Sequence, residues 1–403
     1  MSAPATAPAT ERPPATRLDA RVEAVLPVLR EDAARIDEAA AFPVRGLAAL
    51  RESGLMGLLV PQEHGGLGGS SADLTHVARE LAGECLSTAM IWAMHCQQVA
   101  ALTRHGSPGL RAHLLPRIAR GEVYVASVTS EKVKGGHLLS AHSPLTEESD
   151  GSLRLDREAP IVTGGAHADG FLITLRDGPA AAPHQVTAVY ADRSRLTVEE
   201  GPDRWNPMGM RGTHSIPLRL SGTVDETAVV GRRGGFKDVA VADFVPAGHL
   251  AWAACWLGAV RGALRSVLKL LRSPAGRRQF DLSGRQLRAR LARVRMELDA
   301  MAALLAQVTA DSDRHRGTAG AGSPPVQMRL NALKVYTAER SFACVDQLIR
   351  VVGLRHGYMR HSDLPLERLF RDLRSASLNY ADDRLLAANG AMCLLDREVS
   401  LAD

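Results

Sequence analysis

The sequence predicts a mostly α-helical chain with a central β domain, arranged in the order helices, strands, helices. One observation is the change in periodicity: apolar residues recur at helical spacing toward both ends, and short β-prone runs fill the middle. Another is the length of 403 residues, 45% of them hydrophobic, which suffices for two or three domains with a sizeable core. We predict a tail at 1–17, helices at 18–122, a β domain at 123–244 and a four-helix bundle at 245–403.

The tail and the N-terminal domain differ in composition. Residues 1–17 are rich in Ala, Pro and Thr and lack the apolar core of a signal peptide, so they are predicted to be disordered. Helical spacing begins at Leu18 and returns in an amphipathic stretch at 44–51. Residues 64–69 read HGGLGG, which is too glycine-rich for a helix. Helices are predicted again at 71–102, capped by a serine, and at 108–120.

The β domain and the bundle are predicted from the spacing of apolar residues and from the turn residues that separate the runs. Turns containing Gly, Pro or Asp separate β-prone runs at 123–129, 152–155, 160–163, 171–175, 185–190 and 216–220. Beyond residue 245, four long helices are predicted at 249–272, 283–311, 326–352 and 364–398. A Gly/Ser/Pro linker joins the second helix to the third, and four such helices are typical of a four-helix bundle.

Charge and cysteine content narrow the class of protein. The net charge is +5 and the pI about 9.1, but the arginines are dispersed along helices. This distribution suits anionic substrates or cofactors better than a nucleic-acid groove. The five cysteines lie far apart with no CxxC pair or metal-ligand spacing, as expected of buried thiols in the cytoplasm. No run reaches the roughly 18 uninterrupted apolar residues of a membrane span, so we expect a cytoplasmic enzyme without a membrane segment.

Four local strings carry a family resemblance. They are GLMGLLVPQEHGGLGGS at 54–70, APIVTGGAHAD at 159–169, WNPMGMRGTHS at 205–215 and LPLERLFRDLRSA at 364–376. In this order they resemble segments of the acyl-CoA dehydrogenase superfamily and extend over nearly the whole chain. The resemblance implies a homotetramer that binds FAD, with FMN the less favoured cofactor, between the β domain and the bundle. A neighbouring subunit would contribute to each site.

The resemblance also implies flavin-binding residues. Thr129 and Ser130 match the family's strand that contacts the flavin ring, and Thr163 matches a second contact, although each residue type is also ordinary at a strand end. The aromatic residue common just upstream of that second contact is Ile161 here.

A second set of cofactor residues is expected near the flavin phosphates. Arg277 and Phe280 resemble an Arg-x-x-Phe element whose arginine reaches the partner subunit's FAD, a task suited to a planar guanidinium. A solvated arginine at a helix end is the alternative interpretation. Gly353 and Gly357 resemble a glycine-rich turn of the family that lets the phosphates approach the backbone. The three residues between these glycines, however, interrupt the compact pattern of the family.

The expected catalytic base is missing. Straight-chain acyl-CoA dehydrogenases carry a glutamate shortly after the Arg-Asp motif, and alignment on that motif puts Tyr380 there. A phenol with a pKa near 10 is a poor base at neutral pH. Relatives that move the glutamate to the first bundle helix have it where this chain has Ala251 and Trp252. Asp382 is the nearest carboxylate, although its position also favours a helix cap.

The C-terminal segment at 380–386 favours a different chemistry. Residues 380–386, YADDRLL, resemble the reduced-flavin monooxygenase branch, which oxidises nitrogen, sulfur or aromatic carbon and needs no such base. His95 in the apolar stretch 90–96 is a candidate donor to the activated oxygen, and a buried core histidine is the alternative.

Three hypotheses therefore stand. The favoured one is a monooxygenase acting on a small organic substrate, supplied with reduced flavin by a separate reductase. The alternative is a dehydrogenase of acyl-CoA or acyl-carrier thioesters with a relocated base, for which Asp382 is the candidate. A flavin-binding relative without catalysis is the third.

Overall fold

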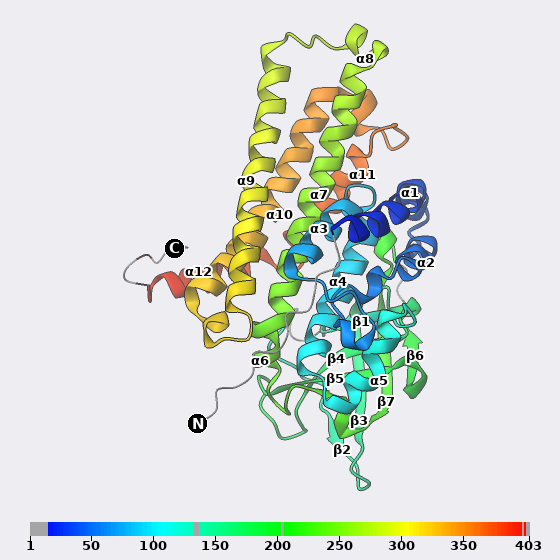
Figure 1. The fold of residues 1–403 in the computed structure, drawn as a ribbon, viewed down its shortest axis with the longest axis vertical. Coiled ribbons are helices and arrows are strands. Elements are labelled where there is room, and N and C mark those ends of the chain that lie inside the picture. Colours follow the sequence, from blue (N-terminus) through cyan, green and yellow to red (C-terminus); the bar gives the residue numbers. More distant parts are fainter. Residues whose placement is uncertain (1–14, 133–136, 203–204, 397–398, 400–403) are drawn as a thin grey trace.

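The computed structural model describes residues 15–132, 137–202, 205–396 and 399. It has the predicted order of helices, a β domain and a helical bundle (Figure 1). The β domain lies at one end of the elongated molecule and the long bundle helices extend toward the other, with the N-terminal helices beside the junction. Most of the predicted tail lies outside the described residues, and its last residues begin the first helix.

The N-terminal domain is a layer of helices between the bundle and the β domain. Its elements are α1 (Ala15–Ala39), α2 (Val44–Glu52), η1 (Leu55–Gly57), η2 (Gln62–His64), α3 (Ser71–Ala82), α4 (Leu86–His105) and α5 (Pro108–Ala119). The helix predicted at 71–102 is two helices with a turn between them. The capping serine is Ser70, whose hydroxyl accepts the Asp73 N–H while the Asp73 carboxylate accepts the Ser70 N–H.

The β domain consists of two four-stranded sheets. One has the order β1 (Val125–Val128), β4 (Gly170–Arg176), β5 (Val186–Asp192), β8 (Val229–Val230), and the other β2 (Thr146–Glu147), β3 (Leu153–Thr163), β7 (Ser215–Val224), β6 (Leu196–Glu200). Strand β4 lies in the interior of its sheet, between the parallel β1 and the antiparallel β5, and its continuous apolar run is buried. Strand β3 alternates buried and exposed residues up to an irregularity between Ala159 and Val162.

The bundle departs from the prediction in its last helix. Its helices are α7 (Val245–Arg272), α9 (Arg285–His315), α10 (Pro324–Gly353), α11 (Leu366–Arg374) and α12 (Asp382–Cys393), with shorter pieces α6 (Phe236–Val239), η7 (Ala240–Phe244), α8 (Pro274–Gln279), η8 (Ala319–Gly322) and η9 (Leu354–Tyr358). The helix predicted at 364–398 is broken between α11 and α12, in its described part. At the break Tyr380 has a positive φ of 57°, which a continuous helix cannot contain.

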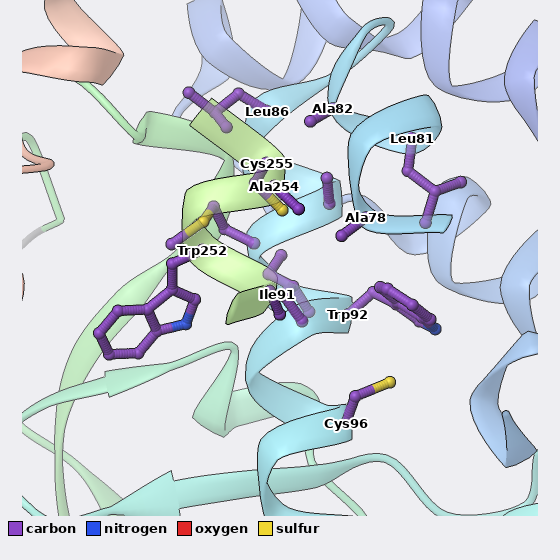
Figure 2. Close-up of a cluster of buried hydrophobic side chains, with 14 of the residues drawn as sticks. Ala78, Leu81, Ala82, Leu86, Ile91, Trp92, Cys96, Trp252, Ala254 and Cys255 are labelled. Carbon is purple, nitrogen blue, oxygen red and sulfur yellow. The ribbon is translucent and has the colours of Figure 1, made fainter. Parts of the chain in front are cut away.

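Helix α7 is the core of the molecule and packs directly on α3. A Cβ at Gly258 would lie 2.1 Å from the Arg79 carbonyl, and one at Gly262 would lie 2.4 Å from the Gly83 carbonyl. These two glycines therefore allow the close approach of the helices. Figure 2 shows apolar side chains of α3, α4 and α7 meeting at this contact, with Trp252 turned to the other side of α7 from Trp92.

The same helix explains an apparent membrane signal. The helical run Phe236–Arg272 has the length and hydropathy of a membrane span. However, 78% of its apolar window is buried inside the protein. We interpret it as the central helix of the core rather than as a span.

Candidate functional site

The ends of β1 and β3 lie side by side, with the Ile161 side chain exposed at the surface and Thr163 buried beneath it. Thr129 and Ser130 follow β1, which is an edge strand of its sheet. The Ser130 hydroxyl donates to the carbonyl of Ile161 at 2.8 Å, and Ile161 is 57% exposed. Thr163, two residues further along β3, shares a hydrogen bond of 3.0 Å with the Ser215 hydroxyl. The structure thus brings together Ser130 and Ile161, close in sequence to the predicted contacts Thr129 and Thr163.

This surface fits the chemistry of a flavin ring. Hydroxyl groups and the backbone groups of an edge strand can bond the polar edge of the ring, while an exposed aliphatic side chain can pack on its apolar face. The segment after β1 is stabilised by Arg157, which donates to the Ser130 carbonyl at 2.9 Å and forms a buried ion pair with Glu131. Thr129, Ser130 and Thr163 therefore remain our candidates for flavin contacts.

The two positions considered for a catalytic base meet in space. Tyr380 lies in the turn before α12 and Trp252 on α7, and their ring centroids are 6.2 Å apart. His249, one turn earlier on α7, lies 5.9 Å from Trp252 and 5.4 Å from Tyr380. Tyr380 packs against both hydrophobic clusters of the protein, so this aromatic cluster of His249, Trp252 and Tyr380 lies where they adjoin.

Burial makes the aromatic cluster uncharged near neutral pH. Burial and the nearby Lys334 ammonium lower the pKa of His249 to about 3. Burial also raises the pKa of the Tyr380 phenol well above its ordinary value. The cluster therefore contains a neutral imidazole, a neutral phenol and an indole, and none of them is a strong base.

Asp382 is held by a buried lysine. Lys334 on α10 has 0% of its side chain exposed and donates to the Asp382 carboxylate at 2.5 Å and to the Ala376 carbonyl at 3.0 Å. Its ammonium also lies 5.6 Å from the ring centroid of Trp256. Burial raises the pKa of Asp382, and the hydrogen bond from Lys334 opposes that rise. As a relocated base, Asp382 would have to give up its bond to Lys334.

His95 is fully engaged with backbone groups. Its Nδ1 accepts the Val125 N–H at 3.1 Å, so its Nε2 carries the proton and donates to the Met56 carbonyl at 3.0 Å. The ring is buried, which lowers its pKa to about 4. This geometry favours a core histidine over the candidate donor to activated oxygen, because the ring has no donor to spare.

The second set of predicted cofactor residues lies far from the aromatic cluster. Arg277 is exposed on α8, and Phe280 lies 6.0 Å from the ring of His356. Gly353 immediately precedes η9 and Gly357 lies within it, and Gly353 has a φ of 72° with open space around it. From Trp252 to the end of α7 the helix rises about 30 Å, and α8 lies at the far end of the molecule from the β domain (Figure 1). These residues are grouped together, but apart from the cluster of their own chain.

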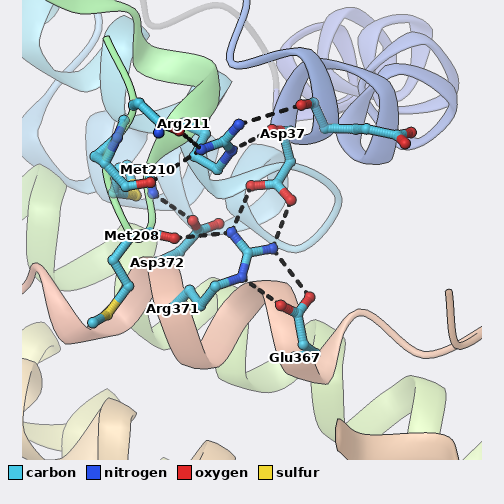
Figure 3. Close-up of polar contacts among 10 residues, drawn as sticks. Asp37, Met208, Met210, Arg211, Glu367, Arg371 and Asp372 are labelled. Atoms are coloured by element: carbon cyan, nitrogen blue, oxygen red, sulfur yellow. Dashed lines mark hydrogen bonds and ion pairs between the residues drawn. The ribbon is translucent and has the colours of Figure 1, made fainter. Parts of the chain in front are cut away.

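A network of ion pairs and hydrogen bonds holds α11, the helix that precedes Tyr380, in place. Arg371 on α11 makes two bonds to the Asp37 carboxylate of α1, at 3.0 and 2.6 Å, and also binds Glu367 (Figure 3). The adjacent Asp372 carboxylate accepts the Met210 N–H at 2.5 Å, and burial raises its pKa to about 6. The Arg-Asp motif thus joins α11 to the N-terminal domain and to the β domain.

Sequence reasoning missed two residues of this site. His249 precedes Trp252 by three positions, which places both on one face of a helix. Lys334 follows Leu330 by four positions and so lies on the apolar face of its helix. A charged residue on a buried face needs a buried partner, and this signal could have led to the pair with Asp382.

Comparisons with known proteins agree with this architecture. The family model described as acyl-CoA dehydrogenase, N-terminal domain, matches residues 20–122, and that of the C-terminal domain matches 239–379. The amino sugar nitrososynthase DnmZ of Streptomyces peucetius is 28% identical over 384 residues, covering 90% of this chain and 89% of that protein.

Solved structures show the same fold. The FMN-bound dibenzothiophene monooxygenase TdsC of Paenibacillus sp. A11-2 has a TM-score of 0.83 and 22% identity, covering 95% of this chain and 98% of that one. KijD3 in complex with dTDP has a TM-score of 0.81 and 22% identity, covering 94% and 96%. The two family models together span more than half of the sequence. The chain therefore belongs to the acyl-CoA dehydrogenase superfamily of flavin-dependent oxidoreductases, for which FAD is the standard cofactor.

Proposed function

We propose that this protein is a reduced-flavin monooxygenase that oxidises the nitrogen of an amino sugar. The observation that carries the proposal is the aromatic cluster: Tyr380 stands at one position where dehydrogenases of the family place a glutamate, and Trp252 stands beside Ala251 near the other. His249 beside them is neutral, and the nearby carboxylate of Asp382 is bound by Lys334. Abstraction of a proton from carbon needs a positioned base, and this aromatic cluster does not offer one in a free state.

The proposed chemistry divides between cofactor and chain. A reduced flavin supplies two electrons that allow one oxygen atom of O₂ to reach the substrate while the other becomes water. Thr129, Ser130 and Thr163 are proposed to hold the polar edge of its ring. The aromatic cluster is proposed to form the wall against which the substrate lies, and its apolar rings exclude water from that wall.

The substrate class is proposed from the relatives. DnmZ is described as an amino sugar nitrososynthase, and KijD3 was solved with dTDP. We therefore propose an amino sugar, carried on a nucleotide, as the substrate of this chain. A separate flavin reductase is the proposed source of reduced flavin.

The assembly and the location are proposed as well. Arg277 and Phe280 follow the end of α7, about 30 Å beyond Trp252, and Gly353 and Gly357 lie in the neighbouring segment around η9. This separation supports a homotetramer in which these residues serve a neighbouring subunit's FAD. A cytoplasmic location is supported by the five free cysteines, four of them buried.

The test begins without oxygen. The protein is loaded with oxidised FAD and mixed with acyl-CoA and acyl-carrier thioesters while the flavin absorbance is followed. We expect no bleaching. The flavin is then reduced, and O₂ is admitted with a dTDP-linked amino sugar, after which mass spectrometry should show a product heavier by one oxygen.

Two outcomes would contradict the proposal. Bleaching by a thioester would identify a dehydrogenase, and its loss in Asp382→Asn would name Asp382 as the relocated base. If oxygen consumption yields only hydrogen peroxide with every amine tested, the proposal that the substrate is an amino sugar is wrong.

A further inference from the structure

Buried polar atoms without partners gather around the aromatic cluster. Among the described residues, neither ring nitrogen of His249 makes a hydrogen bond of normal geometry, although the ring lies near the Leu330 carbonyl. The Trp252 Nε1 and the Asp382 Oδ2 are likewise buried and without a hydrogen-bond partner in the described part of the chain. His249 is only 1% exposed, so water at the surface does not satisfy its nitrogens. Such a group of unsatisfied atoms indicates a missing polar ligand or internal water.

The unsatisfied atoms define what the ligand must offer. The indole N–H can only donate, the carboxylate oxygen can only accept, and the neutral imidazole does one of each. A matching group must therefore both donate and accept, as a neutral amine, a hydroxylamine or a hydroxyl does. A thioester carbonyl or an aromatic hydrocarbon cannot donate a hydrogen bond and matches less well.

The charges around the cluster come from three elements. On α10, Lys334 lies within reach of His249 and is paired with Asp382, and Glu339 acts on Asp382 from the same helix. On α12, Asp383 acts on Asp382 and Arg384 acts on Tyr380. On α7, His249 itself is neutral.

Burial decides which of these charges matter most. Lys334 and Asp382 have 0% and 8% of their side chains exposed, whereas Glu339 is 50% exposed and is screened by solvent. The buried positive charge therefore balances the buried negative charge. A third buried charge, such as a substrate ammonium, would have no partner of its own.

We propose that the Lys334–Asp382 pair makes the aromatic cluster a site for the substrate's nitrogen in its uncharged amine form. This proposal rests on the proposed function and names the form of substrate that it uses. The amine binds beside His249 and Trp252, and the Lys334–Asp382 pair, which has no net charge, leaves no opposite charge to balance a protonated substrate. Lys334 and Asp382 are positioning residues, since they act on the substrate through the charge of the pocket.

The protonation state matters because only the free amine has a lone pair. In the overall step, the amine and O₂ give a hydroxylamine and water. The N–O bond forms from the nitrogen lone pair, the O–O bond breaks, and the reduced flavin provides two electrons and two protons. An ammonium ion would first have to lose its proton inside the pocket, where His249 is too weak a base to take it.

The experiment counts protons on binding. Calorimetric titration of the FAD-loaded protein with a dTDP-linked amino sugar, at pH 7 in buffers of different ionisation enthalpy, should show the release of nearly one proton per ligand. This number follows because an amine with a pKa of about 8 is largely protonated in solution. With dTDP-glucose, a ligand that has hydroxyls but no amine, no proton should be released. The apparent Kd of the amine should rise by up to about tenfold for each unit by which the pH falls below that pKa.

Two variants sharpen the test. Lys334→Gln leaves the Asp382 carboxylate without its cation, so the pocket should now accept the ammonium and proton release should fall toward zero. Asp382→Asn keeps the lysine charge and should retain the release. Circular dichroism and flavin content show whether each variant folds, and the pH series on the parent protein decides the question if Lys334→Gln does not.

The outcomes separate the two proposals. Binding of the amino sugar without proton release would overturn this inference and leave the proposed function standing. Absence of binding by any amino sugar, free or linked to dTDP, would overturn both.

Discussion

Two histidines of this protein are neutral for the same reason but occupy different environments. Burial depresses the pKa of both His95 and His249. His95 is satisfied by two backbone partners, whereas His249 has none of normal geometry among the described residues. At the scale of the residue, hydrogen-bond satisfaction separates a structural histidine from a site histidine better than burial does.

Stability should depend on pH through His95. The pKa of His95 is about 4 in the folded protein against an ordinary value of 6.5, so its contribution is complete above pH 6.5 and is lost as the pH falls toward 4. The difference in unfolding free energy between the parent and His95→Gln should shrink by about 3 kcal/mol from pH 7 to pH 4. Urea denaturation over a pH series measures this difference. A constant difference would show that His95 is not held neutral.

The hydroxyl of Tyr380 should matter little to turnover. Tyr380→Phe keeps the ring contacts with His249 and Trp252, so the loss should stay well below the roughly 100-fold effect of removing a general acid or base. His249→Phe should cost more activity, because it removes the imidazole that we propose to face the substrate. Steady-state turnover per bound flavin makes the comparison, and an equal loss in both variants would argue against a role for His249.

His95→Ala should act on folding rather than on turnover. It would leave the Met56 carbonyl and the Val125 N–H buried without partners, at a cost of about 1–3 kcal/mol each. Thermal unfolding should therefore show a clear loss of stability. Turnover per folded, flavin-loaded molecule should fall by less than in His249→Phe, and a reversed order would restore His95 as a candidate catalytic residue.

At the scale of the element, α11 is placed by charge as much as by packing. Arg371→Ala would leave the Asp37 and Glu367 carboxylates facing each other without the guanidinium, and we expect a loss of about 3–5 kcal/mol in unfolding free energy. Arg371→Lys should recover only part of it, since an ammonium cannot make the two parallel bonds. Full recovery by lysine, measured by chemical denaturation, would contradict the importance of the bidentate geometry.

The helices and strands could be predicted from the sequence wherever the spacing of apolar residues determines them. The order of helices, strands and helices follows from apolar spacing, and the four-residue spacing of buried positions along α7 and α10 is visible in the sequence. The break between α11 and α12 was not predicted, because the apolar pattern continues through it to Leu385. A positive φ at a tyrosine is set by tertiary contacts rather than by local preference.

The site was predictable only in part for a related reason. Motif spacing led to Tyr380 and Trp252, which the structure brings together, but not to the neighbours that define their chemistry. His249 and Lys334 reach the cluster through the packing of α7 against α10, a long-range contact that a single sequence does not reveal.

At the scale of the whole molecule, the distance between the two groups of proposed cofactor residues predicts interdependent subunits. Arg277→Ala should weaken FAD binding by about tenfold or more, because a guanidinium paired with phosphate contributes on the order of 1.5–3 kcal/mol. Arg278→Ala is the matched control, since it removes an equally exposed neighbour. Fluorescence of released flavin measures both, and equal effects would indicate general electrostatics rather than a phosphate site.

The same distance predicts that assembly and cofactor retention are coupled. Leu354, Tyr358 and Met359 are 73%, 66% and 58% exposed near that end of the bundle, which is a large apolar exposure for one loop. Met359→Glu should shift the oligomer toward smaller species in light scattering and should also release FAD. Loss of assembly with full retention of FAD would mean that each chain binds its cofactor alone.

The left-handed backbone of Tyr380 has a consequence for laboratory evolution. A bulky residue at this conformation costs about 1 kcal/mol that glycine or asparagine would not. A library randomised at this codon and screened for heat resistance should therefore enrich glycine and asparagine, whereas a screen for product should enrich aromatic residues that keep the contacts with His249 and Trp252. Two screens of one library would thus show how much stability this enzyme gives up to keep an aromatic ring at its proposed substrate wall.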